Sequence, residues 1–134
     1  SNLLLPMLGI VRAEDPRFLG TLDATRERLC RDGLVLRYVN TDDFGETESA
    51  FSICTFWYAE ALALAGRLDE AVEVFQRMAK HANPLGLFSE DVDPATGALL
   101  GNFPQAYTHV GLVNAATTIG HALAARDRTE HAWS

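Results

Sequence analysis

Helical segments of two kinds alternate along this chain, and the alternation limits what the chain can fold into. The segments expected at residues 16–31 and 68–81 each carry one apolar stripe, with charged residues on the remaining surface. Those expected at 49–65 and 105–125 are apolar nearly all round, with Glu60 as the one charge in the first and no charge in the second. A helix that is apolar on every side must be covered on every side. We therefore expect an all-α fold of alternating outer and inner helices.

Several helix ends are marked by their residue types. Asp15 is the expected N-cap of the first helix, and Pro16 its first helical residue. Gly66 suits the position just beyond the second helix, because glycine accepts the left-handed backbone conformation found there. Alternation of period two never lasts beyond about four residues, so only residues 34–38 are expected as a brief extended piece.

Two loops, residues 32–48 and 83–104, each lead from a one-sided helix to an apolar one. Both exceed the roughly 2–8 residues usual between packed helices. Since both run in the same sense, they should emerge at the same end of a double layer. Long loops on a rigid scaffold commonly carry functional sites.

Charge and hydropathy exclude several functions. The 134 residues include 11 Lys and Arg against 18 Asp and Glu, a net charge of -7, whereas non-specific nucleic-acid binding needs a basic face. The opening apolar run, residues 3–11, is much shorter than the ~20 residues of a membrane span, and no signal-like segment precedes it. We therefore expect a cytoplasmic protein that binds neither nucleic acid nor membrane.

The cysteines and histidines lack the spacing of redox or zinc sites. Cys30 and Cys54 do not form a CxxC pair, so reduced thiols are favoured over a disulfide. Asp91, Asp93 and Gly97 do not fit the EF-hand spacing, and a turn beginning at Asp93 is the better interpretation. We expect no metal and no cofactor.

Glu90 is the strongest candidate for chemistry. It lies in a loop between helices, next to Phe88 and Asp91, and a Pro/Gly turn follows. This setting suits acid/base catalysis, with a solvated or capping loop acid as the alternative. Glycoside hydrolysis needs two carboxyl groups, and the chain offers no convincing second one. The sequence therefore suggests part of an enzyme.

Two neighbouring runs resemble the last part of the glucoamylase family, glycoside hydrolase family 15, and its bacterial glucoamylase-like and trehalase-like members in particular. They are GLFSEDVDPATG at 86–97 and LGNFPQAY at 100–107. Residues 33–38, 46–57 and 62–67 are similar to the same family, so the resemblance covers about residues 3–125. It implies that residues 1–134 are the C-terminal segment of one (α/α)6 toroid, a catalytic domain whose N-terminal part is absent.

The resemblance also implies an inverting hydrolase of α-linked glucosides or oligosaccharides. Glu90 would be the general base that activates a water, and Arg37 resembles a substrate-binding arginine. Further candidates for sugar contact are Glu48, Phe88 and Tyr107. The general acid of the family lies upstream of these residues. We therefore expect the isolated chain to be inactive, and either to self-associate or to contact the missing N-terminal part.

Each binding residue also has a simpler interpretation. Arg37 has the alternative of pairing with Asp42 or Asp43, and aromatic rings at helical spacing more often pack in a core. For the whole chain, residues 58–71 read like part of a tetratricopeptide repeat, which favours a non-catalytic interaction scaffold. Such a scaffold needs at least about three copies at a ~34-residue period, and the sequence contains one.

Overall fold

The structure is a computed structural model that describes residues 1–38, 41–42, 45–46 and 49–131. Within these ranges the chain is mostly helical, as predicted. Four α-helices are present: α1 (Pro16–Leu29), α2 (Ser52–Leu64), α3 (Leu68–Ala79) and α4 (Ala106–His131). A short 3-10 helix, η1 (Asn2–Leu4), precedes them.

Seven strands of two residues each complete the described structure. They are β1 (Cys30–Arg31), β2 (Leu34–Val35), β3 (Thr41–Asp42), β4 (Gly45–Glu46), β5 (Ala50–Phe51), β6 (Asp91–Val92) and β7 (Leu99–Leu100). All pair antiparallel, as the sheets β1–β2, β3–β4 and β5–β6–β7.

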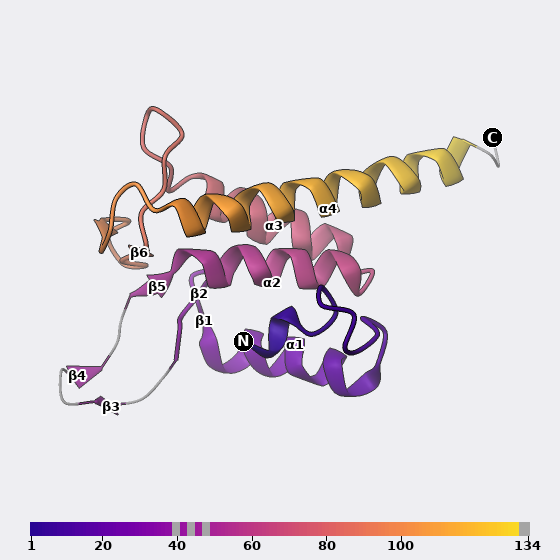
Figure 1. Cartoon of the computed structure of the whole chain (residues 1–134), viewed down its shortest axis with the longest axis horizontal. Helices are drawn as coiled ribbons and strands as arrows, with labels where there is room; N and C mark the ends of the chain where they lie inside the picture. Colours follow the sequence, from indigo (N-terminus) through magenta and orange to yellow (C-terminus); the bar gives the residue numbers. More distant parts are fainter. Residues whose placement is uncertain (39–40, 43–44, 47–48, 132–134) are drawn as a thin grey trace.

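Helix α2 occupies the centre of the molecule, with α1 on one side and α3 and α4 on the other (Figure 1). Eleven of its 13 residues are buried, which confirms the covering predicted from its all-round apolar surface. Gly111 allows α4 to approach α2 closely, since a Cβ there would lie 3.0 Å from Ile53 and 3.3 Å from Phe56.

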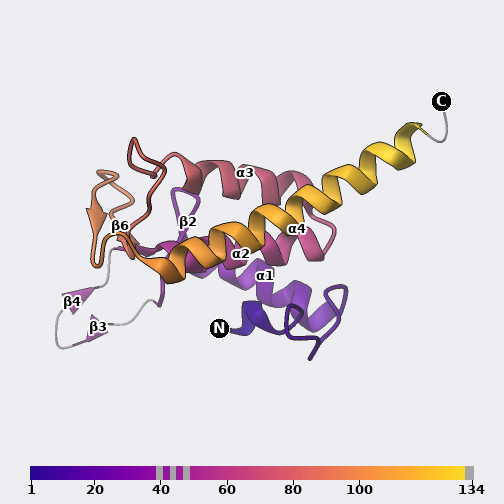
Figure 2. The same cartoon turned by 45° about the horizontal axis from the view of Figure 1, so that its top comes forward.

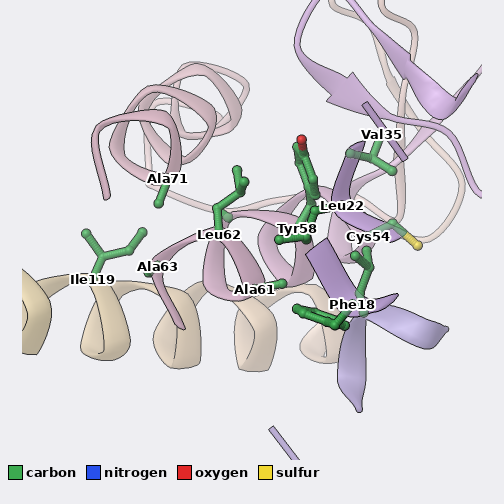
Figure 3. Packing of buried hydrophobic residues seen from close by; sticks show 12 residues of the cluster. Phe18, Leu22, Val35, Cys54, Tyr58, Ala61, Leu62, Ala63, Ala71 and Ile119 are labelled. Carbon is green, nitrogen blue, oxygen red and sulfur yellow. The ribbon is translucent and has the colours of Figure 1, made fainter. Parts of the chain in front are cut away.

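The core has two parts. The larger lies among α1, α2 and α3, where Leu22, Tyr58 and Leu62 are fully or nearly fully buried (Figure 3). The smaller lies toward the loops and joins Phe56 of α2, Met78 of α3 and Phe88. This second cluster anchors the loop that contains Glu90 to the helices.

The helix ends follow the sequence signals with two corrections. Asp15 caps α1, its Oδ1 accepting a hydrogen bond from the Arg17 backbone N–H at 2.9 Å, and Gly66 after α2 has a φ of 79°. However, α1 ends at Leu29 instead of Arg31, and α2 begins at Ser52 instead of Ser49. In both cases the residues predicted as helical pair as strands, β1 with β2 and β5 with β6.

Helix α4 departs further from expectation. It continues beyond the predicted end at residue 125 to His131. Its C-terminal end, past the ion pair of Arg126 with Asp69 of α3, projects away from the other helices (Figure 2). Val110 and Val113 are 54% and 60% exposed, so the described residues do not cover this helix on every side, as expected for an inner helix without the rest of its ring. Its described partners, α2 and α3, cover one side only. Among the described residues, no helix combines the length and the apolarity that crossing a bilayer requires.

The two long loops meet at one end of the helices, as predicted. Strand β5, which follows the first loop, pairs with β6 of the second, and Leu36 forms an isolated bridge with Ala50. Figure 1 shows β5 and β6 at this end, next to the first turns of α2 and α4. The candidate site therefore lies where two segments distant in sequence are joined by backbone hydrogen bonds.

Candidate functional site

The loop between α3 and α4 folds as a hairpin closed by the turn predicted at Asp93. One carboxylate oxygen of Asp93 accepts hydrogen bonds from the backbone N–H groups of Ala95 (2.8 Å) and Thr96 (3.3 Å). The other accepts the Thr96 hydroxyl at 2.6 Å, and this bond is the main reason that the pKa of Asp93 is lowered. The turn aligns β6 with β7 and so determines which residues face each other at the base of the hairpin.

Phe88 attaches the hairpin to the core, which corrects its predicted role as a sugar-binding ring. Its side chain is 3% exposed and meets Phe56 and His109 edge-on, with ring centroids 5.4 and 5.7 Å apart. The Phe88 backbone N–H also donates to His109 Nε2 at 3.3 Å. The ring fills space between α2 and α4, and a sugar has no access to its face.

Glu90 lies directly before β6 and is half-buried. Its Oε2 accepts two hydrogen bonds from Asn102, one from the backbone N–H at 3.1 Å and one from the side-chain amide at 2.7 Å. The Glu90 carbonyl accepts from the N–H of Ser52, the first residue of α2. The hydroxyl of the preceding residue, Ser89, donates to the Asp91 carbonyl at 2.6 Å.

The pKa of the adjacent Asp91 is influenced by one negatively and one positively charged side chain. Burial raises the pKa of Asp91, the charge of Glu90 raises it further, and the charge of Arg37 opposes the rise. Arg37 comes from the first loop, so its influence on Asp91 indicates that the two loops bring opposite charges near each other.

A cavity of about 580 Å³ opens beside the pair formed by β5 and β6. Its lining includes two of the predicted site residues, Arg37 and Tyr107, together with Phe51, Cys54 and Trp57. The Arg37 guanidinium carbon lies 5.2 Å from the centroid of the Phe51 ring, a cation–π distance. Trp57 and Tyr107 meet edge-on with centroids 5.7 Å apart, and Tyr107 is 51% exposed. The cavity therefore has an aromatic wall with a cation at its edge.

Glu90 is next to this cavity through the backbone and is not part of its lining. Phe51, a lining residue, pairs in register with Asp91, the neighbour of Glu90. Burial raises the pKa of the lining thiol Cys54 to about 11, so that thiol is protonated at neutral pH. Both Cys54 and Cys30 are free thiols.

Glu48, a predicted contact to sugar, lies outside the described residues. The same holds for Asp43 and for the side chain of Asp42, the alternative partners of Arg37. In the part of the chain that the structure describes, no three His, Cys, Asp or Glu side chains gather as a metal site.

Asn102 and Gly101 face Glu90 across the hairpin, and neither was predicted from the sequence as a site residue. A Cβ on Gly101 would lie 2.9 Å from Glu90 Oε2, and the φ of this glycine is 71°. The signal was present in the turn predicted at Asp93. Asp91 pairs with Leu100, so continuing the ladder by one residue places Gly101 opposite Glu90.

Comparison with known proteins identifies the family of this loop-and-helix arrangement. Residues 1–117 match glycosyl hydrolases family 15, and the chain belongs to that family. Three similar relatives are named trehalase: those of Thermoplasma volcanium (44% identical over 92% of this chain), Thermoplasma acidophilum (42% over 94%) and Mycolicibacterium smegmatis (40% over 97%).

The matches cover 20–22% of the length of these relatives, so the chain spans about a fifth of the proteins it resembles. No solved structure matches the chain. Family membership agrees with the resemblance identified in the Glu90 loop, and the repeat-scaffold alternative does not predict it.

Proposed function

We propose that residues 1–134 form the C-terminal segment of an (α/α)6 catalytic domain and supply the general base of an inverting α-glucoside hydrolase. The observation that carries this proposal is the Glu90 carboxylate, anchored through Oε2 by two N–H donors in a loop that matches the family. Because the chain is about a fifth of the length of its relatives, the general acid would come from other parts of the domain.

A general base must be ionised and must present an oxygen to the attacking water. Two N–H donors on Oε2 hold the Glu90 carboxyl group in one position. Within the described residues both bonds fall on Oε2, which leaves Oε1 to accept a proton from water. In an inverting enzyme the acid would lie roughly 6.5–9.5 Å from this carboxyl group.

The neighbouring cavity has the chemistry of a sugar site. Sugar rings offer hydroxyl groups to donors and C–H faces to aromatic rings. Arg37 would donate to hydroxyl groups, and Tyr107 with Trp57 would form an apolar wall. Glu48 remains a candidate for a further hydroxyl contact.

Trehalose is the first substrate to test, because the similar relatives are named trehalases. Maltose is the second, since the resemblance extends to glucoamylase-like members. With trehalose, inversion releases one β-glucose and one α-glucose per bond cleaved, whereas retention releases two α-glucose molecules. Proton NMR of the fresh products distinguishes these outcomes.

The decisive variant is Glu90→Gln in the full-length protein. Glutamine keeps the size of the side chain and cannot take a proton, so kcat should fall about 10²–10⁴-fold with either sugar. Glucose release measured at saturating substrate checks this.

Glu73→Gln on α3 is the matched control. Glu73 forms an exposed ion pair with Arg77 of the same helix, and its loss should leave kcat unchanged. Equal glucose release by wild type and Glu90→Gln would remove Glu90 from the mechanism. Lack of activity in the wild type with both sugars would overturn the proposed function itself.

A further inference from the structure

We propose that Asn102 is the positioning residue for the Glu90 base, donating to one carboxylate oxygen so that the other is aimed at the attacking water. The inference rests on the proposed function of Glu90. Three hydrogen bonds join them: Glu90 N–H to the Asn102 carbonyl at 2.9 Å, and the backbone and side-chain N–H groups of Asn102 to Glu90 Oε2.

These bonds restrict the carboxylate in orientation as well as position. The backbone pair fixes the distance between the two chains of the hairpin, and the amide at 2.7 Å then holds Oε2 from the side. With Oε2 occupied twice, Oε1 is the oxygen left to face a water. A base held in one orientation needs no reorganisation before it reacts.

The contacts also match the chemistry of a carboxylate. The amide nitrogen of Asn102 can only donate, and an ionised carboxylate can only accept. A carboxylate accepts such a hydrogen bond more strongly than a neutral carboxylic acid does, so the amide suits the form that a general base requires.

The hairpin is built to bring Asn102 this close. Gly101 precedes it with a φ of 71°, and the hydrogen on its Cα leaves room that a methyl group would take, 2.9 Å from Oε2. On the other side, Gln105 N–H donates to the Phe88 carbonyl at 3.0 Å, which ties the chain after Asn102 to the buried part of the loop.

The test is the pH dependence of kcat/KM with trehalose, measured on the full-length protein carrying Asn102→Asp or Asn102→Ala. A second carboxylate beside Glu90 disfavours its ionisation, so the acid limb of the Asn102→Asp profile should move about one unit toward higher pH. Asn102→Ala keeps the backbone N–H and loses the amide. The acid limb of the Asn102→Ala profile should also move toward higher pH, by a smaller amount. Its kcat should be about tenfold lower than that of the wild type, and its KM little changed.

Thr96→Ala is the matched control, since it removes a hydrogen bond from the same hairpin without touching Glu90. Its profile should coincide with that of the wild type. A merely structural role for Asn102 would lower activity by one factor at every pH and leave the acid limb in place, and that result overturns the inference. The same holds for unchanged kinetics in both Asn102 variants.

The two levels of failure can be told apart. Suppose that the wild type hydrolyses trehalose and Glu90→Gln does not, but that the acid limbs of both Asn102 variants coincide with that of the wild type. The positioning role of Asn102 is then wrong, and the proposed function of Glu90 stands. If Glu90→Gln retains full activity, the proposed function itself is wrong. Thermal unfolding of each variant identifies loss of folding, and Asn102→Ala, which keeps the backbone bonds, serves if Asn102→Asp does not fold.

Discussion

At the scale of single residues, the candidate site depends on contacts of Glu90 that the loop sequence alone does not reveal. The sequence pointed to Glu90 through its setting between helices and its family resemblance. The partner that holds it, Asn102, is 12 residues away and meets it only because the hairpin closes. Phe88, next but one to Glu90, fills the core instead of facing a cavity. The register of the opposite strand therefore determines the contacts of Glu90 more than its neighbours in the sequence do.

Gly101→Ala should cause a modest loss of stability and a large loss of catalytic activity. An alanine here carries about 1–2 kcal/mol of left-handed backbone strain, and its Cβ would also displace the Glu90 carboxylate. A displacement of about 1 Å at a catalytic group costs about 10²-fold in kcat. We expect a loss of roughly that size in glucose release by the full-length protein.

Gly97→Ala is its matched control. Gly97 has nearly the same φ, 72°, but a Cβ there would meet only the His81 ring at 3.6 Å, an ordinary contact. The two variants should lose similar stability and differ in activity. Equal activity losses would attribute the effect to backbone strain and not to Glu90.

At the scale of elements, the packing of α2 against α4 includes one buried acid. Glu60 on α2 is 8% exposed, and its Oε1 accepts a hydrogen bond from the Thr118 hydroxyl of α4 at 3.1 Å. Burial raises the pKa of Glu60, and the bond from Thr118 opposes the rise. The folded chain therefore holds this proton to higher pH than the unfolded chain does. Stability falls as pH rises from the unfolded value, near 4.3, through the raised folded value.

Glu60→Gln should stabilise the chain at pH 7, because the amide needs no ionisation in a buried site. The gain should be on the order of 1 kcal/mol, the scale of one buried polar group, and should vanish near pH 4, where the wild-type carboxyl group is protonated in both states. Urea unfolding followed by circular dichroism at the two pH values measures it. Glu73→Gln, an exposed acid on α3, should show no such difference. A gain that persists unchanged at pH 4 would rule out ionisation as its cause.

At the scale of the whole molecule, α4 presents an apolar face that the described chain does not cover. Tyr107, Val110 and Val113 are each more than half exposed, whereas eleven of the 13 residues of α2 are buried. Exposed apolar side chains gathered on one face favour association. This agrees with the expectation that an inner helix needs neighbours on every side, and it is one reason for proposing that these residues belong to a larger ring.

The isolated chain should therefore self-associate, and a charge on this face should reduce the effect. We expect Val113→Lys to lower the weight-average mass measured by sedimentation at micromolar concentration. A lysine buried between two associated chains would have to lose its hydration. Gln76→Lys, an exposed position on α3, adds the same charge elsewhere and should leave the mass unchanged. A wild-type chain that sediments as a monomer at every concentration would contradict this account of α4.

The sequence by itself determined the helical class, the alternation of one-sided and all-round apolar helices, the two loops and the prominence of Glu90. These features depend on residue types at short spacing, and helical periodicity, caps and turns act over a few residues. Only the tertiary structure decided that β5 pairs with β6, that Asn102 holds Glu90 and that Phe88 is buried. Those outcomes depend on which distant segments pair and in which register, and a register is set by the packing of the whole chain.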